Sequence, residues 1–374
     1  MADDALPEAD RIEGIAHPRE TLALLGQTQA EAAFLQAWNG DHAHHAWLIT
    51  GPRGVGKATL AWRIARFLLS QPPRDGGGMF APERPETLDT PADHPVTRRT
   101  MALGEPGLFL LRRAWDDKKK ALKTVITVDE ARKLKDFFGM SAPGGGHRVV
   151  IIDSADEMNT NTANAILKLL EEPPDNCTLL LISHAPARLL PTIRSRCRTL
   201  RCAPLSPGDL TQVLARTGEQ TDAPEALGEL ADGSVGEALR LLHMDGMKIY
   251  QTLVSLLEGA PQMDRPRLLA LAGTMTGRAA AERLDLTLRL LDRLLARLAR
   301  TGAGLPPAVE ITRGETDMLH RLAPDPWAGR EWADLQQALS ARAAHGRAVN
   351  LDPSALILDM GLTINQTAAR LAGR

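Results

Sequence analysis

The chain has 374 residues, enough for two or three domains with a sizeable core. Hydrophobic residues make up 44% but aromatic residues only 3%, a balance that favours packed helices over aromatic-rich β-sandwiches. The formal net charge of -2 excludes a general electrostatic attraction to nucleic acid, so any contact with DNA has to be local. The 3 cysteines include no C-x-x-C pair, which excludes a disulfide framework and a four-thiolate zinc site and indicates a reducing cytoplasm.

The N-terminal residues 1–16 are acidic and lack the basic start and apolar run of a targeting segment, so we expect a disordered tail. No run of about eighteen apolar residues occurs in the sequence, and no membrane contact is expected. Helical spacing predicts a helix over 20–45, and then a buried strand at 46–50 and an amphipathic helix over 57–70. A glycine-rich loop therefore joins a strand to a helix.

Residues 72–106 are rich in Pro, Gly and Asp and predict an inserted surface loop. After this loop, helices are expected over 128–138 and 158–170, alternating with buried strands at 149–153 and 178–183. The alternation predicts a parallel sheet covered by helices on both faces. Beyond residue 205 no strand of similar quality occurs, and the remainder is predicted to be helical.

The loop Gly51-Pro52-Arg53-Gly54-Val55-Gly56-Lys57 has the spacing of a phosphate-binding loop. Its glycines allow backbone N–H groups to approach phosphate oxygens, and Lys57 can reach the terminal phosphates from a helix N-terminus. The alternative, a glycine-rich turn that holds no nucleotide, is disfavoured by the strand-loop-helix context. The sequence therefore predicts a P-loop.

The residues that would bind Mg²⁺ and activate water are incomplete. Ala58 stands where the motif has a Ser or Thr hydroxyl on the metal ion, and Thr59 is turned by about 100° around the helix. Asp153 suits the acid that holds the metal, but Ser154 stands where ATPases of this type place a carboxylate. We therefore expect poor hydrolysis at a nucleotide site made by Gly51, Gly54, Gly56, Lys57, Thr59 and Asp153.

Two basic segments lie outside this loop. Residues 116–123 (DDKKKALK) favour a solvated loop over a phosphate-binding patch. The motif SRC at 195–197 lies in an arginine-rich stretch that, by composition alone, would be a solvated basic turn.

The motif order resembles the clamp-loader family of AAA+ ATPases, and within it the delta-prime type of bacterial DNA polymerase III subunit. The resemblance is carried by HAWLITGPRGVGKATLA at 45–61, ITVDEARKL at 126–134, VVIIDSADEMNTNTANAILKLLEEPP at 149–174 and SHAPARLLPTIRSRC at 183–197. It implies an α/β P-loop AAA+ core over 17–205, a small helical lid over 206–246 and an all-α collar domain over 247–374. In this family the collar is where the subunits of a ring hold together.

The resemblance also implies roles for single residues. The Ser-Arg-Cys motif of the family presents its arginine to ATP bound by a neighbouring subunit, so Arg196 would be an arginine finger acting in trans. A guanidinium is permanently charged and forked, which suits the charge on a transferring phosphoryl group. Subunits of the delta-prime type do not hydrolyse ATP, and Ala58 and Ser154 agree with this. Gly236 stands where active ATPases carry a sensor-two arginine.

The implied partners are clamp-loader subunits of the gamma/tau and delta types in a hetero-pentameric ring, a sliding clamp, and primer-template DNA through the complex. Related ATPase subunits often carry four zinc-binding cysteines, whereas 60–148 contains none, so no zinc is expected. The intact glycine loop leaves room for ATP bound without hydrolysis. Two alternatives stay open. One is a self-sufficient AAA+ ATPase, either a hydrolysing loader subunit or a helicase-type motor, that relies on Thr59 and Asp156. The other is a pure scaffold with an empty P-loop.

Overall fold

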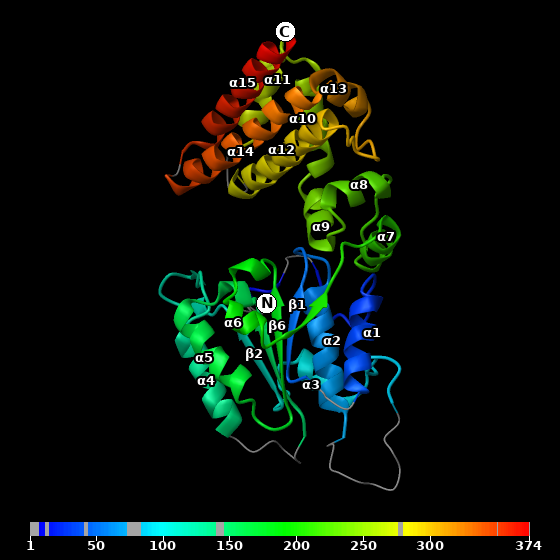
Figure 1. The fold of residues 1–374 in the computed structure, drawn as a ribbon, viewed down its shortest axis with the longest axis vertical. Coiled ribbons are helices and arrows are strands. Elements are labelled where there is room, and N and C mark those ends of the chain that lie inside the picture. Colours follow the sequence, from blue (N-terminus) through cyan, green and yellow to red (C-terminus); the bar gives the residue numbers. More distant parts are fainter. Residues whose placement is uncertain are drawn as a thin grey trace, which may run out of the picture. The chain divides into compact units, whose positions relative to one another are not determined.

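The structure is a computed structural model that describes residues 7–11, 15–40, 44–72, 84–139, 146–275, 280–349 and 351–373. The chain divides into two compact units (Figure 1). The first unit contains the residues up to Gly218 together with Ser234–Gly236. The second contains Glu219–Gly233 and the chain from Glu237 onward.

A five-stranded parallel sheet forms the centre of the first unit. Its strands are β1 (Ala46–Thr50), β2 (Leu108–Arg112), β5 (Arg148–Asp153), β6 (Cys177–Ser183) and β7 (Arg198–Arg201), in the spatial order β2-β5-β6-β1-β7. The register places Ile49 beside Ile182 on one side and Leu200 on the other. Every residue of β1 and β6 is buried, as expected for central strands of a sheet covered on both faces.

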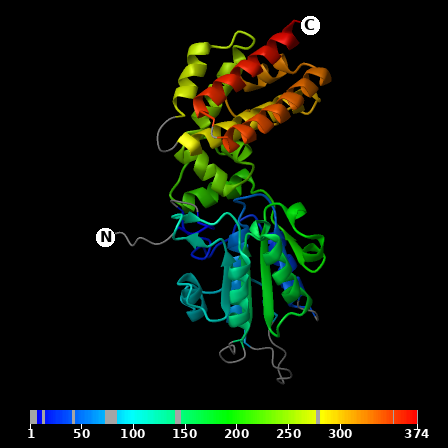
Figure 2. The ribbon, with the colours of Figure 1, turned by 90° about the vertical axis from the view of Figure 1, so that its left-hand side faces the viewer.

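Helices cover both faces of this sheet (Figures 1 and 2). One face carries α1 (Thr28–Trp38), α2 (Lys57–Ser70) and α3 (Pro95–Met101), and the other carries α4 (Val128–Gly139), α5 (Thr160–Glu171) and α6 (Pro191–Arg194). Under α4 and α5, Leu134 and Ile166 pack with Val150 and Leu181 of the sheet. Each such fully buried side chain contributes roughly 1.5–3 kcal/mol. The predicted α/β class is confirmed.

The helix expected over 20–45 is shorter than predicted, because α1 begins only at Thr28. The preceding segment has a turn at 18–20 and no helix, and it is bonded to α2. Arg66 donates hydrogen bonds to the carbonyl oxygens of Arg19 at 2.9 Å and Thr21 at 3.0 Å. Carbonyl groups engaged in this way are withdrawn from a helical ladder, which explains why the local propensity did not decide the outcome.

The inserted loop expected over 72–106 contains a helix. Pro95 occupies the first position of α3, and the His94 side chain accepts a hydrogen bond from the N–H of Val96. Residues 73–83 of this segment lie outside the described part of the chain, as do 143–145 of the predicted Pro-Gly break. Strands β2 and β7, which the sequence pattern did not predict, complete the sheet.

The basic run forms the turn of a small hairpin. β3 (Trp115–Asp116) pairs antiparallel with β4 (Ala121–Leu122), and the lysines 118–120 between them are exposed. Asp116 Oδ1 accepts hydrogen bonds from the backbone N–H groups of Lys118 at 3.0 Å and Lys119 at 3.1 Å. The expected loop is therefore an ordered turn with solvated lysine side chains.

Beyond Arg201 the described residues form helices and their connections. They are α7 (Pro207–Arg216), α8 (Pro224–Ala231), α9 (Val235–His243), α10 (Gly246–Glu258), α11 (Arg265–Gly273), α12 (Ala280–Gly302), α13 (Glu315–Leu322), α14 (Pro326–Ala348) and α15 (Pro353–Ala372). α12 and α14 approach closely at two glycines, since a Cβ on Gly302 would lie 2.6 Å from the Cα of Gly329. The helical second half is confirmed, and the lid and collar boundaries at 206–246 and 247–374 stay predictions.

One ionic network is buried in the second unit. Glu315 accepts hydrogen bonds from the Tyr250 hydroxyl at 2.5 Å, from Arg297 Nε at 2.7 Å and from the N–H of Ile311 at 2.7 Å. Arg297 also donates to Glu229 of α8 at 2.8 Å. This single guanidinium therefore links α8 and α13 to α12.

Candidate functional site

The predicted P-loop connects β1 to α2 at the carboxyl edge of the sheet. Gly51, Gly54 and Gly56 have φ values of 143°, 73° and 99°, which residues other than glycine rarely adopt. A Cβ on Gly51 would also lie 2.3 Å from the Cys202 carbonyl oxygen. The three glycines are therefore required by the path of the loop as well as by any approach of phosphate.

Lys57 folds back onto its own loop. Its Nζ donates to the carbonyl oxygen of Gly51 at 2.6 Å and to that of Pro52. Burial lowers the pKa of the Lys57 ammonium to about 8. The ammonium is still mostly charged at neutral pH, and these two carbonyl groups hold it against its own loop.

Gln27 braces the loop, a role that the sequence pattern did not indicate. Its Nε2 donates to the carbonyl oxygens of Val55 at 2.9 Å and Ala203 at 2.8 Å, and its Oε1 accepts from the N–H of Ala203 at 3.0 Å. The buried amide thus ties the P-loop to the segment that follows β7. A lone glutamine after a glycine carries no signal that would reveal such a long-range contact.

The metal-binding half of the site does not fit a magnesium ion. Ala58 presents a methyl group on the first turn of α2, and the following residue, Thr59, is partly buried there. The loop can receive phosphate oxygens, but the chain does not supply the usual hydroxyl ligand for their metal.

Asp153 lies buried at the end of β5, next to the equally buried Ser154. Burial, together with the charges of Asp10 and Glu157, raises the pKa of Asp153 to about 7, against the opposing effects of Lys57 and Arg112. Burial and the neighbouring negative charges therefore disfavour the ionised form of this carboxyl group. The acid is therefore present at the predicted position but in an unfavourable electrostatic setting.

The two neighbouring carboxylates are engaged elsewhere. Asp156 accepts hydrogen bonds from Ser183 Oγ at 2.5 Å and from the N–H groups of His184 and Ala185 at the end of β6. Glu157 pairs with Arg113 at 2.7 Å and with Arg53 at 3.8 Å. Neither side chain is free to act as the missing base, which counts against the self-sufficient ATPase.

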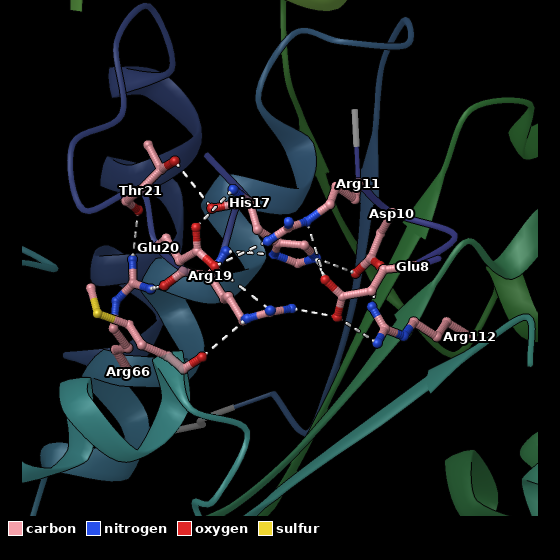
Figure 3. Close-up of polar contacts among 10 residues, drawn as sticks. Glu8, Asp10, Arg11, His17, Arg19, Glu20, Thr21, Arg66 and Arg112 are labelled. Carbon is pink, nitrogen blue, oxygen red and sulfur yellow. Dashed lines mark hydrogen bonds and ion pairs between the residues drawn. The ribbon is translucent and has the colours of Figure 1, made fainter. Parts of the chain in front are cut away.

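Residues 7–11, part of the segment expected to be a disordered tail, contact the edge of the sheet (Figure 3). Glu8 pairs with Arg19 at 2.6 Å and with Arg112 of β2 at 2.8 Å. Asp10 pairs with Arg112 and lies 3.1 Å from His17 Nε2. Acidic composition alone cannot distinguish a solvated tail from one whose arginine partners lie about a hundred residues away, and this is why the sequence pattern missed the contact.

Gly236, which the family resemblance places at the sensor-two position, lies beside the P-loop. The N–H of Val235 donates to the Gly54 carbonyl oxygen at 3.0 Å, and a Cβ on Gly54 would lie 2.2 Å from Ser234 Oγ and 2.9 Å from Gly236 N. The segment Ser234–Gly236 therefore packs directly on the loop. Without a side chain, Gly236 brings no charge to it.

Arg196 lies on the turn after α6. Its side chain is 36% exposed. Nη1 donates to the carbonyl oxygen of Thr192 at 3.0 Å, and Nη2 lies 2.8 Å from Glu171 Oε1 at the end of α5. The guanidinium is thus accessible and is oriented by one carbonyl group and one carboxylate.

The fold and this site define a class, the α/β proteins with a P-loop, here without the usual Ser or Thr after the loop lysine and with a helical C-terminal half. A family described as DNA polymerase III, delta subunit, matches residues 26–206. The chain is 35% identical over 230 residues to DNA polymerase III subunit delta′ of Pseudomonas aeruginosa, covering 62% of this chain and 64% of that protein. It is 30% identical over 292 residues to subunit delta′ of Escherichia coli, covering 77% and 80%.

The chain therefore belongs to the DNA polymerase III subunit delta′ family of clamp-loader proteins, although the match spans less than two thirds of the Pseudomonas aeruginosa relative. A solved structure of a DNA polymerase III gamma subunit-related protein from Thermotoga maritima overlays with a TM-score of 0.39 at 16% identity, covering 90% of this chain and 99% of that one. Within the described ranges, no helix is both long and apolar enough to cross a bilayer.

Proposed function

We propose that this chain is a delta-prime subunit of a DNA polymerase III clamp loader, which does not hydrolyse ATP itself and which presents Arg196 to ATP held by a neighbouring subunit. The observation that carries this proposal is that the chain combines an incomplete site for ATP hydrolysis with an accessible arginine. The P-loop lacks its metal hydroxyl at Ala58 and its base at Ser154, while an accessible guanidinium lies elsewhere on the same domain.

The assembly follows from the same proposal. The chain joins gamma/tau-type and delta-type subunits in a hetero-pentameric ring in the cytoplasm, through a collar over 247–374. The ring opens a sliding clamp and places it on primer-template DNA, and this chain performs no polymerisation. The family membership supports these partners, because relatives of this chain include subunits named gamma and gamma/tau.

We also propose that the P-loop can bind ATP without turning it over. Gly51, Gly54 and Gly56 keep the anion cradle, and Lys57 can exchange its two carbonyl partners for phosphate oxygens. Titration of the isolated chain with ATP should give binding that Mg²⁺ strengthens little. Turnover near 1 s⁻¹ or faster, an ordinary enzymatic rate, would instead support the self-sufficient ATPase.

The test of the finger is reconstitution of the complete loader with Arg196→Ala. Arginine fingers supply roughly 10³- to 10⁵-fold in rate, so hydrolysis at the affected interface should be almost lost and clamp loading should slow at least about ten-fold. Arg194→Ala is the matched control, because Arg194 is exposed and only two residues away. Loading and stimulated ATPase at wild-type rates in Arg196→Ala would refute the assignment.

A further inference from the structure

The guanidinium of Arg196 already has a carboxylate partner in its own chain. α5 and α6 lie on the same face of the sheet (Figure 1), and this brings Glu171, the last residue of α5, to 2.8 Å from Arg196 Nη2. Both side chains face solvent in part, with 36% of Arg196 and 50% of Glu171 exposed. The second contact, to the Thr192 carbonyl oxygen, uses the other terminal nitrogen.

We propose that Glu171 is a positioning residue that holds Arg196 in a resting orientation and competes with the neighbouring subunit's nucleotide for it. This inference rests on the proposed action of Arg196 in trans. A carboxylate and a phosphate oxygen bind the same N–H groups of a guanidinium, so the two ligands exclude each other at Nη2. A carboxylate left beside a triphosphate would also be repelled by its charge.

The geometry permits the exchange. Glu171 is half exposed at a helix end, so its side chain can turn into solvent. The Thr192 carbonyl can keep Nη1 while Nη2 changes its partner, because a guanidinium offers five N–H donors. Glu171 therefore sets the resting orientation of the Arg196 guanidinium, and Thr192 keeps the guanidinium at the same place on the surface during the exchange.

The expected strength of this restraint is modest. Ion pairs between exposed side chains shift an equilibrium by roughly 1.5- to 5-fold. An ion pair of this strength keeps the Arg196 side chain ordered in the free subunit. A phosphate group with several negative charges can still displace Glu171 from Arg196. The ion pair also weakens as salt screens it.

The test compares Glu171→Gln with Glu172→Gln in the reconstituted loader, because Glu172 is the exposed neighbour one residue along. Glu171→Gln should lower the ATP concentration for half-maximal hydrolysis by about 1.5- to 5-fold with little change in the maximal rate. Glu172→Gln should behave as wild type. The decrease in this ATP concentration caused by Glu171→Gln should become smaller as the salt concentration rises. It should disappear when Arg196→Ala is added, which a purely structural role of Glu171 would not produce.

Three results would overturn the restraint: no difference between the two glutamine variants, a decrease in this ATP concentration that persists in Arg196→Ala, or a fall in maximal rate with Glu171→Gln. These results are separable from failure of the proposed function. If Arg196→Ala alone leaves clamp loading and ATP hydrolysis at wild-type rates, the assignment of Arg196 as an arginine finger is wrong. The proposed role of Glu171 is then wrong as well. If Arg196→Ala is defective and Glu171→Gln is silent, only the restraint is wrong.

Discussion

Arg112 and Asp153 are register partners at the carboxyl ends of the adjacent strands β2 and β5. Arg112 is the arginine that pairs with Glu8 and Asp10, and Asp153 is the acid predicted for the P-loop site. The N-terminal segment therefore adds two carboxylates to the edge of the sheet where nucleotide phosphates would lie. This relationship makes the segment part of the site's electrostatics.

Asp10→Asn should destabilise the first unit. Burial alone would raise the pKa of Asp10, but its contacts with His17 and Arg112 outweigh this and hold the pKa below its usual value. A carboxylate whose pKa is depressed stabilises the fold above its unfolded pKa, and this stability is lost as pH falls through the lower folded pKa. The expected loss is about 1–3 kcal/mol at pH 7, measured by urea unfolding.

Asp10→Asn should change the free energy of unfolding little at acidic pH, where Asp10 is protonated in both the folded and the unfolded state. Asp129→Asn is the control, since its ion pair with Arg132 is largely exposed and should contribute less than about 1 kcal/mol. Equal stability of Asp10→Asn and wild type at pH 7 would show that residues 7–11 do not hold the sheet edge.

Asp153→Asn should stabilise the protein at alkaline pH. The pKa of an aspartate is ordinarily 3.8, and that of Asp153 in the folded protein is about 7. Between these pH values the folded state therefore binds more protons than the unfolded state. The free energy of unfolding therefore falls as pH rises through this window. Asparagine does not titrate, and the variant's advantage should grow by up to about 2–3 kcal/mol from pH 5 to pH 8.

This measurement needs unfolding curves at several pH values for both proteins. Asp136→Asn is a suitable control because Asp136 is exposed on α4. A difference between wild type and Asp153→Asn that stays constant from pH 5 to pH 8 would contradict the raised pKa of Asp153.

The three cysteines should react slowly with thiol reagents while the protein is folded. Burial raises the pKa of Cys177 and Cys197 to about 12 and that of Cys202 to about 11. The thiolate is the reactive form, so little is present at pH 8. Reaction with a chromogenic disulfide should become fast, with three equivalents, only in denaturant. A fast first equivalent that disappears in Cys197→Ser would show that the arginine-rich turn activates this thiol.

Arg297→Met should unfold the second unit more easily, because it leaves the buried Glu315 without its guanidinium. Removing one partner of a buried ion pair typically costs about 3–5 kcal/mol. The double variant Arg297→Met/Glu315→Met should recover part of this loss, since no unpaired carboxylate remains. Lys248→Met is the control, because its pair with Asp245 lies in solvent. Equal melting of the single and double variants would contradict a penalty that arises from the unpaired charge.

The sequence predicted the elements whose patterns are local. β1, β5, β6, α2, α4 and α5 agree with the predicted ranges to within two residues, because each is a continuous apolar run or an amphipathic repeat with clear ends. The P-loop was equally visible, since three glycines at fixed spacing serve one backbone path. The pattern also singled out Lys57 and Asp153, whereas Arg196 was singled out only by the family resemblance, and the contacts of all three come from the structure.

What the sequence could not reveal depends on contacts between distant segments. β7 (RTLR) has one buried residue, Leu200, and becomes a strand only because β1 offers it an edge. The non-helical path before α1 depends on Arg66 of α2, and Gln27 bonds to Val55 and Ala203. Single polar residues of this kind have no periodicity, so their partners cannot be inferred from spacing.

The three residues Ser234–Gly236 belong to the first unit although they lie inside a stretch that otherwise belongs to the second. A gene fragment that stops after Gly218 would therefore remove Val235, whose N–H bonds to the Gly54 carbonyl oxygen. Such a fragment would contain every P-loop residue and still leave one side of the loop uncovered. Any nucleotide affinity measured on it would describe a damaged loop, so dissection of this protein has to proceed by substitution in the full chain.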